Sequence, residues 1–206
     1  MAGAFPISSE NFETMGIKSN QSPIISKSLS GKKLSRQIDN QRFGFTASII
    51  AGKRSVIYGE LMAFIMKQRS SKENFTITPP EVKSTRGSED QVVSVNGSHT
   101  AGDTTIAIDG FGADRSGRLK SGDFIKFAGH TKVYMIVAEF TPSSGAATVT
   151  IEPPLLSALA DDEVVTYNNV PFTVHLTNDL QEFGVVGADG SGNLLYKFEI
   201  DVEEAI

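Results

Sequence analysis

The chain has 206 residues, of which 39% are hydrophobic and 21% charged, with 19 Gly, 8 Pro and a formal net charge of −5. These proportions are typical of a globular protein with many turns and exclude disorder as the main state. The absence of cysteine excludes disulfides, thiolate catalysis, Cys-type zinc sites and iron–sulfur ligation.

Two further absences bear on location and partners. No apolar run reaches 18 residues and the first residues lack a signal-peptide pattern, so we expect neither a membrane span nor secretion by that route. Basic residues are scattered except for "GKKLSR" at 31–36, so no broad surface for specific nucleic-acid binding is expected.

The N-terminal part predicts an arm, a strand and a helix in succession. Residues 1–35 are polar and read as an extended arm, or as a strand pair that turns at "SNQSP". In "RFGFTASII", Phe43 and Phe45 alternate with small or polar residues, which predicts a half-buried strand over 43–49. After a turn at "AGKR", a helix is expected over 55–69, with Ser55 capping its start.

The middle of the chain predicts a separate β module. A short strand in "NFTITPP" ends at two prolines, which cannot donate to a sheet. From about residue 92 to 167, short strands alternate with Gly, Asp and Ser turns and no helical pattern appears, which is typical of a small barrel or sandwich. The glycines of "SGRLKSGDFIKFAGH" are expected to form turns, with Ile125 and Phe127 in the core.

The C-terminal part predicts a hairpin with a turn at "GADGSGN". In its last strand, Phe198, Ile200 and Val202 alternate with acidic residues, so one face is apolar and the other acidic. The predicted fold class is mainly β with a minor α component. A sandwich-like domain with one α-helix, residues 1–90 plus 168–206, is interrupted by a barrel or sandwich module, residues 91–167.

No motif for catalysis, a cofactor or a metal stands out. Gly117 to Gly122 has Walker-loop spacing, but Asp123 stands where Lys is needed and a strand follows instead of a helix. "GFGADR" lacks the third glycine of a dinucleotide loop, and the three histidines lie far apart. We therefore predict no catalytic, cofactor-binding or metal-binding residues and no cofactor. A cell-wall or polysaccharide hydrolase is disfavoured, because no pair of carboxylates is placed to converge on a bond.

Several segments resemble, in their order, bacteriophage tail proteins akin to the distal tail proteins. The resemblance covers nearly the whole chain. In that family a glycine commonly follows the helix, where this chain has Ser70 and Ser71. The matching segments are "FPISSENFETMGIKSNQSPIISKSLSGKKLSRQIDNQRFGFTASI", "GELMAFIMKQR", "FTITPP", "GDTTIAIDGF", "GRLKSGDFIKF", "VYMIV", "GAATVTIEPPL" and "DDEVVTY".

The resemblance implies a structural, non-enzymatic subunit of the virion tail or baseplate, made in the host cytoplasm. It implies a commonly hexameric ring of identical subunits that joins the tail tube to the baseplate hub or tail tip, with fibre proteins as further partners. DNA would pass through the lumen without specific binding, and the acidic face of the last strand could line it. The residues expected at interfaces are Leu34, Arg36, Phe43, Phe45, Tyr196, Phe198, Glu199, Asp201 and Glu203.

A second function stays open for the β module. It could bind a carbohydrate or receptor at the host surface, with Phe111, Tyr134 and Phe140 as the aromatic side chains available to stack on a sugar.

Overall fold

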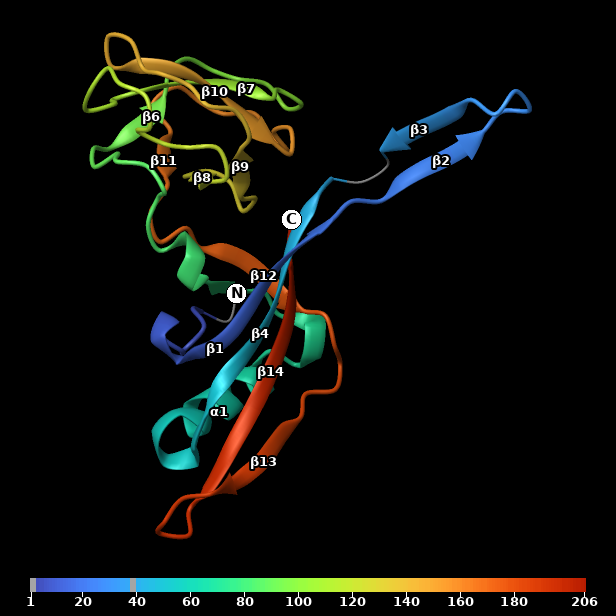
Figure 1. Cartoon of the computed structure of the whole chain (residues 1–206), viewed down its shortest axis with the longest axis vertical. Coiled ribbons are helices and arrows are strands. Elements are labelled where there is room, and N and C mark those ends of the chain that lie inside the picture. Colours follow the sequence, from blue (N-terminus) through green and yellow to red (C-terminus); the bar gives the residue numbers. More distant parts are fainter. Residues whose placement is uncertain (1–2, 38–39) are drawn as a thin grey trace.

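The computed structural model describes residues 3–37 and 40–206, which form a sheet, a barrel and a projecting ribbon (Figure 1). The six-stranded sheet has the order β1-β4-β14-β12-β5, with β13 added on β14. The strands are β1 (Phe12–Asn20), β2 (Pro23–Lys27), β3 (Lys33–Gln37), β4 (Arg42–Lys53), β5 (Phe75–Ile77), β6 (Val93–Val95), β7 (Thr105–Asp109), β8 (Phe124–Phe127), β9 (Tyr134–Ile136), β10 (Ala146–Glu152), β11 (Val164–Thr166), β12 (Phe172–Leu176), β13 (Phe183–Ala188) and β14 (Leu194–Glu204).

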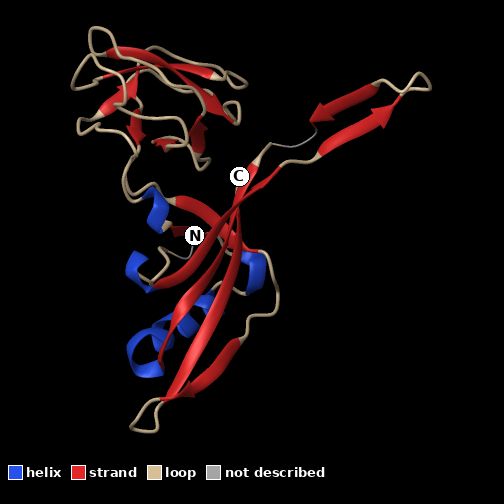
Figure 2. Ribbon diagram, viewed as in Figure 1, coloured by secondary structure: helices blue, strands red, loops and turns tan. Residues whose placement is uncertain are grey.

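Helical structure is confined to a few short elements (Figure 2). A π-helical turn (Arg54–Tyr58) leads into α1 (Gly59–Lys67), and 3-10 turns lie at Ser9–Asn11, Ser70–Lys72 and Pro80–Val82. None of the helices in 3–37 and 40–206 is long and apolar enough to cross a membrane. The predicted class, mainly β with one α-helix and a small barrel, is confirmed.

The two long central strands show the predicted alternation. In β4, Phe43, Phe45 and Ile49 are buried, and in β14 Phe198 and Ile200 are buried. These side chains join those of α1, β5 and β12 in one apolar core. The strand expected over 43–49 is therefore present, although it extends to Lys53, so "AGK" is strand and not a turn.

The helix begins differently from the prediction. Ser55 lies inside the π-helical turn and makes no capping hydrogen bond, and α1 starts at Gly59. The Gly59 N–H bonds to the Arg54 carbonyl, five residues back, and a Cβ on Gly59 would lie 2.7 Å from that oxygen. Glycine is thus required by the close approach of this backbone turn. The buried Tyr58 anchors the turn by donating to the Ile50 carbonyl at 3.0 Å.

The N-terminal strand pair does not turn at "SNQSP" as one alternative predicted. Instead β1 pairs with β4, and the chain continues outward to β2, which pairs with β3. The connection between β2 and β3 is closed by the Gly31 N–H, which donates to the Ser28 carbonyl at 2.9 Å. The β2–β3 pair, here called the ribbon, projects away from both sheet and barrel (Figure 1).

The barrel closes in the order β10-β7-β6-β11-β8-β9 around its own apolar core. Ile125 and Phe127 lie in that core, as predicted. The turn before them has a structural purpose, because the Asp123 carboxylate accepts hydrogen bonds from the backbone N–H of Arg86 and Lys120, both at 2.8 Å. This stretch therefore closes a turn.

Sheet and barrel are joined by paired backbone and by shared packing. β5 precedes the barrel in the chain and β12 follows it, and the two strands pair with each other. Beyond them, the Asn169 N–H donates to the Lys83 carbonyl at 3.1 Å. Phe124 of the barrel packs edge-on to Phe43 of the sheet, with ring centroids 5.2 Å apart. The rim of the barrel therefore completes the core of the sheet.

Candidate assembly surface

The ribbon has the composition of a contact surface and has no core of its own. Ile24, Ile25 and Leu34 are 56%, 52% and 54% exposed. Between Ser22 and Gln37 the only charged residues are basic, and they are Lys27, Lys32, Lys33 and Arg36. An isolated two-stranded hairpin is at best marginally stable in water. The ribbon therefore exposes apolar and positively charged side chains that a partner could cover, including the predicted Leu34 and Arg36.

Three of the aromatic residues expected at interfaces lie inside the molecule. Phe43, Phe45 and Phe198 are at most 2% exposed. Phe45 packs edge-on to Phe172 with ring centroids 4.7 Å apart, and Phe198 stacks on Phe183 at 4.4 Å. They are the inward row of the alternation, so they hold the sheet to its core and cannot meet a neighbouring chain in this conformation. Tyr196 is half-buried beside Tyr58.

The other predicted residues form the outward row of β14. Glu199 is exposed, and Asp201 and Glu203 are half-buried on the same face. The Lys18 ammonium of β1 donates to Asp201 at 2.8 Å, and the Asn20 amide donates to Glu203 at 3.1 Å. Burial acts to raise the pKa of Asp201, but hydrogen bonds from Lys18 and Thr46 outweigh it and hold that pKa below its ordinary value.

This outward face is therefore less acidic than its strand alone suggests. Besides the Lys18 pair, Lys197 of β14 lies 2.6 Å from the Glu13 carboxylate of β1. The sequence pattern showed the acidic row but not the cations that β1 brings to it. The expectation of a uniformly acidic lining is corrected to a face of mixed charge.

Sequence reasoning missed a buried ion pair between barrel and sheet. Lys132 and Glu204 are at most 1% exposed and form a salt bridge. The Glu204 carboxylate also accepts from the Val133 N–H at 2.7 Å and the Phe43 N–H at 3.2 Å. Burial lowers the pKa of Lys132, and the Glu204 charge opposes that shift. The signal was present, because Glu204 continues the inward row Phe198, Ile200, Val202.

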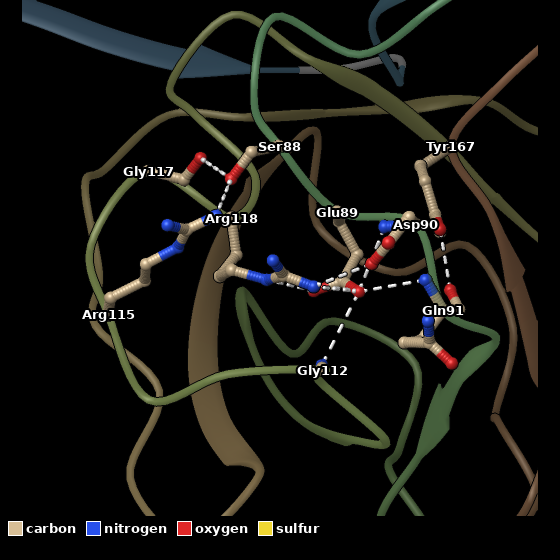
Figure 3. Close-up of polar contacts among 9 residues, drawn as sticks. All are labelled: Ser88, Glu89, Asp90, Gln91, Gly112, Arg115, Gly117, Arg118 and Tyr167. Carbon is tan, nitrogen blue, oxygen red and sulfur yellow. Dashed lines mark hydrogen bonds and ion pairs between the residues drawn. The ribbon is translucent and has the colours of Figure 1, made fainter.

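A second missed cluster joins the linker before β6 to the loop between β7 and β8 (Figure 3). The Arg118 guanidinium binds Glu89 in a two-pronged arrangement, with N–O distances of 2.7 and 2.6 Å, and reaches Asp90 at 3.0 Å. Glu89 also accepts from the Gln91 N–H at 2.9 Å. A Cβ on Gly112 would lie 2.6 Å from Arg118, which explains one glycine of "GFGADR".

The Glu89 cluster is built for structure. Burial acts to raise the pKa of Glu89, but the hydrogen bonds from Arg118 and from backbone N–H groups outweigh it and lower the pKa. Each carboxylate oxygen already accepts a hydrogen bond from the protein. The cluster therefore fixes the linker that enters the barrel, and the described part of the chain shows no group of three His, Asp or Glu side chains placed to hold a metal.

The aromatic side chains suggested for sugar binding are not arranged as a platform. Phe111 is 6% exposed and Tyr134 is fully buried in the barrel core. Burial raises the pKa of Tyr134 to about 12, and its hydroxyl is 2.9 Å from His130 Nδ1. Phe140 is half-buried against Phe111, with ring centroids 5.5 Å apart. Phe111 and Tyr134 belong to the barrel core, and Phe140, which packs against that core, is the one partly exposed ring of the three.

Comparison with known proteins adds one match. Residues 83–170 match the family model described as "Distal tail protein pb9, B domain". The matched range contains the whole barrel and the linkers that enter and leave it. A search of curated proteins finds no match to the chain.

Proposed function

We propose that the chain is a phage distal tail protein that assembles into a homo-oligomeric ring, because residues 83–170 match the B domain of such a protein. Its role in the virion tail is structural. In the proposal, the ring connects the tail tube to the baseplate hub or tail tip and has six subunits. Its neighbours are tail-tube, hub and fibre proteins, and DNA passes through the lumen without specific contacts. Residues 1–90 plus 168–206 would build the ring, and residues 91–167 would form a separate module.

The exposed ribbon is the observation that carries this proposal. Lys27 and Lys33 are directly opposite each other in the β2–β3 ladder, and like charges at opposed positions destabilise a hairpin. Ile24 and Ile25 lie on opposite faces of the same strand and both are exposed. Such a segment gains stability when a neighbouring surface covers it, and in a ring every subunit offers its neighbour that surface.

The mixed-charge face of β1, β4 and β14 fits an exposed position in such an assembly. Its carboxylates are partly matched by Lys18 and Lys197. A face of this kind can border a lumen without attracting phosphate strongly, because its carboxylates outnumber its lysines and like charge repels phosphate.

No observed arrangement of side chains on the described part of the barrel favours the binding of a host carbohydrate. Phe111 and Tyr134 are buried, and the described residues include no other aromatic pair exposed together on the barrel.

The mass of the purified protein in solution tests the proposal. Light scattering across a range of concentrations should give a single species that is a multiple of the 22.1 kDa chain. A particle reconstruction of the virion should place a ring of this protein at the tail-tube end. A protein that stays monomeric and is missing from purified virions would contradict the assignment.

A further inference from the structure

Exposed apolar side chains concentrate in two hairpins at opposite ends of the sheet domain. One is the ribbon, and the other is the β13–β14 hairpin with the loop that leads into it (Figure 1). In the second hairpin Val185 and Val186 are 52% and 56% exposed, and Leu180 and Leu194 are exposed as well. Scattered apolar residues on a surface are ordinary, but grouped ones mark interaction sites.

The outer edge of β13 is open for strand pairing. β13 pairs with β14 on one side, and in the part of the chain that the structure describes no other strand pairs with it. Its sequence, "FGVVGA", has no charge and no proline to protect the edge. Gly184 and Gly187 have no atom within 4 Å of the position of a Cβ, so another backbone can approach closely there.

The two hairpins also carry opposite charge. From Thr177 to Phe198 the acidic residues Asp179, Glu182 and Asp189 outnumber the single basic residue, Lys197, which is itself paired with Glu13. Asp189 is matched by a salt bridge to Lys53, whereas Glu182 is exposed. The ribbon supplies only basic residues, with Lys27 opposed to Lys33. An acidic partner would relieve that repulsion, and opposite charge favours the encounter of the two surfaces.

We propose that the ribbon of one copy pairs along the outer edge of β13 of the next copy and extends its sheet. The ribbon and the edge of β13 lie at opposite ends of the sheet domain. The contact between copies is therefore head-to-tail and repeats from copy to copy, which is the form of interface that builds rings. This inference rests on the proposed function and names the surface that receives the ribbon.

Cross-linking in the naturally cysteine-free chain tests the pairing. A double variant, Ile25→Cys with Val186→Cys, is treated with a short bismaleimide and run on a denaturing gel. The two introduced cysteines lie too far apart to be linked within one chain. Head-to-tail contact between copies therefore gives a ladder of covalent oligomers longer than dimers. Each single variant gives dimers at most. The matched control replaces Val186→Cys by Val164→Cys, a half-exposed valine of the barrel, and should give no ladder.

The outcomes separate this inference from the ring itself. A native oligomer that yields no ladder, with linked peptides mapped elsewhere by mass spectrometry, overturns the β13 assignment and leaves the ring standing. A protein that is monomeric at every concentration overturns both. Lys27→Glu with Lys33→Glu provides a second readout, because it should raise the concentration needed for assembly by at least about tenfold. An unchanged assembly concentration would count against the charge argument.

Discussion

Lys132 and Glu204 form a buried ion pair that joins the barrel to the sheet. Lys132 lies between β8 and β9, and Glu204 is the last residue of β14. The Lys132 ammonium also sits 4.5 Å from the centroid of the Phe43 ring. The same carboxylate accepts backbone hydrogen bonds from Phe43 and Val133, so one side chain ties β4, β14 and the barrel together.

Removing one partner of this pair should be strongly destabilising. Lys132→Met leaves the Glu204 charge buried without its cation, and we expect the free energy of unfolding to fall by about 3–5 kcal/mol. Adding Glu204→Gln should recover part of the loss, because a neutral amide still accepts from backbone N–H. Urea denaturation measures both. Lys83→Met, at an exposed lysine, is the control, and equal losses for Lys83→Met and Lys132→Met would contradict the prediction.

Acid should weaken the barrel through Glu89. The pKa of Glu89 in the folded chain is held below the ordinary 4.5. As the pH falls, Glu89 is therefore protonated in the unfolded chain before it is protonated in the folded chain. The stabilisation is therefore fully present above about pH 4.5 and is lost as the pH falls toward the folded pKa. Urea midpoints measured from neutral pH to about pH 3 should fall less steeply in Glu89→Gln with Arg118→Met. Glu182→Gln, an exposed site, should keep the wild-type slope.

Gly59 should not tolerate a side chain. In Gly59→Ala the new methyl would meet the Arg54 carbonyl at 2.7 Å, and the π-helical turn would have to open. We expect a loss of about 1–3 kcal/mol in thermal or urea unfolding. Gly190→Ala is the matched control, since nothing lies within 4 Å of its Cβ position and its φ is not positive. A neutral Gly59→Ala would show that the turn is not needed.

Arg69→Gly should stabilise the chain. Arg69 and Ser70 follow α1 with φ of 54° and 66°, in the left-handed region that glycine adopts without strain. A glycine at this place would suit that geometry. Because the Ser70 hydroxyl also binds Asp179, Arg69 is the cleaner site, and we expect a gain of about 1 kcal/mol. Lys67→Gly, inside the helix, should instead lose about 1 kcal/mol.

The sequence predicted elements that have one buried face. β4 and β14 alternate because one row of side chains enters the core, and the two-residue period is visible in Phe43, Phe45, Phe198 and Ile200. Turns of the barrel were visible for a similar reason, since glycine and aspartate mark positions where backbone must reverse. The barrel and strand β14 were therefore predicted from their patterns, whereas the short strand β6 was not.

The failures have physical reasons too. The ribbon has no buried face, so no period reveals it, and "SNQSP" suits a chain that continues outward as well as a turn. The start of α1 depends on a contact between Gly59 and Arg54 that no propensity scale contains. Glu204 stood in an inward row, but its partner Lys132 comes from another part of the chain, and only the folded structure brings the two together.

The pairing of β5 with β12 means that the barrel begins and ends at one place. The segment from Lys83 to Asn169 is inserted between the neighbouring strands β5 and β12 and does not interrupt the hydrogen bonds between them. A tail protein of this design can therefore exchange its barrel for another while the sheet stays as it is. Any replacement must meet two requirements: it must supply apolar side chains where Phe124 packs on Phe43, and it must bring a cation to Glu204 or arrive together with a neutral residue at that position.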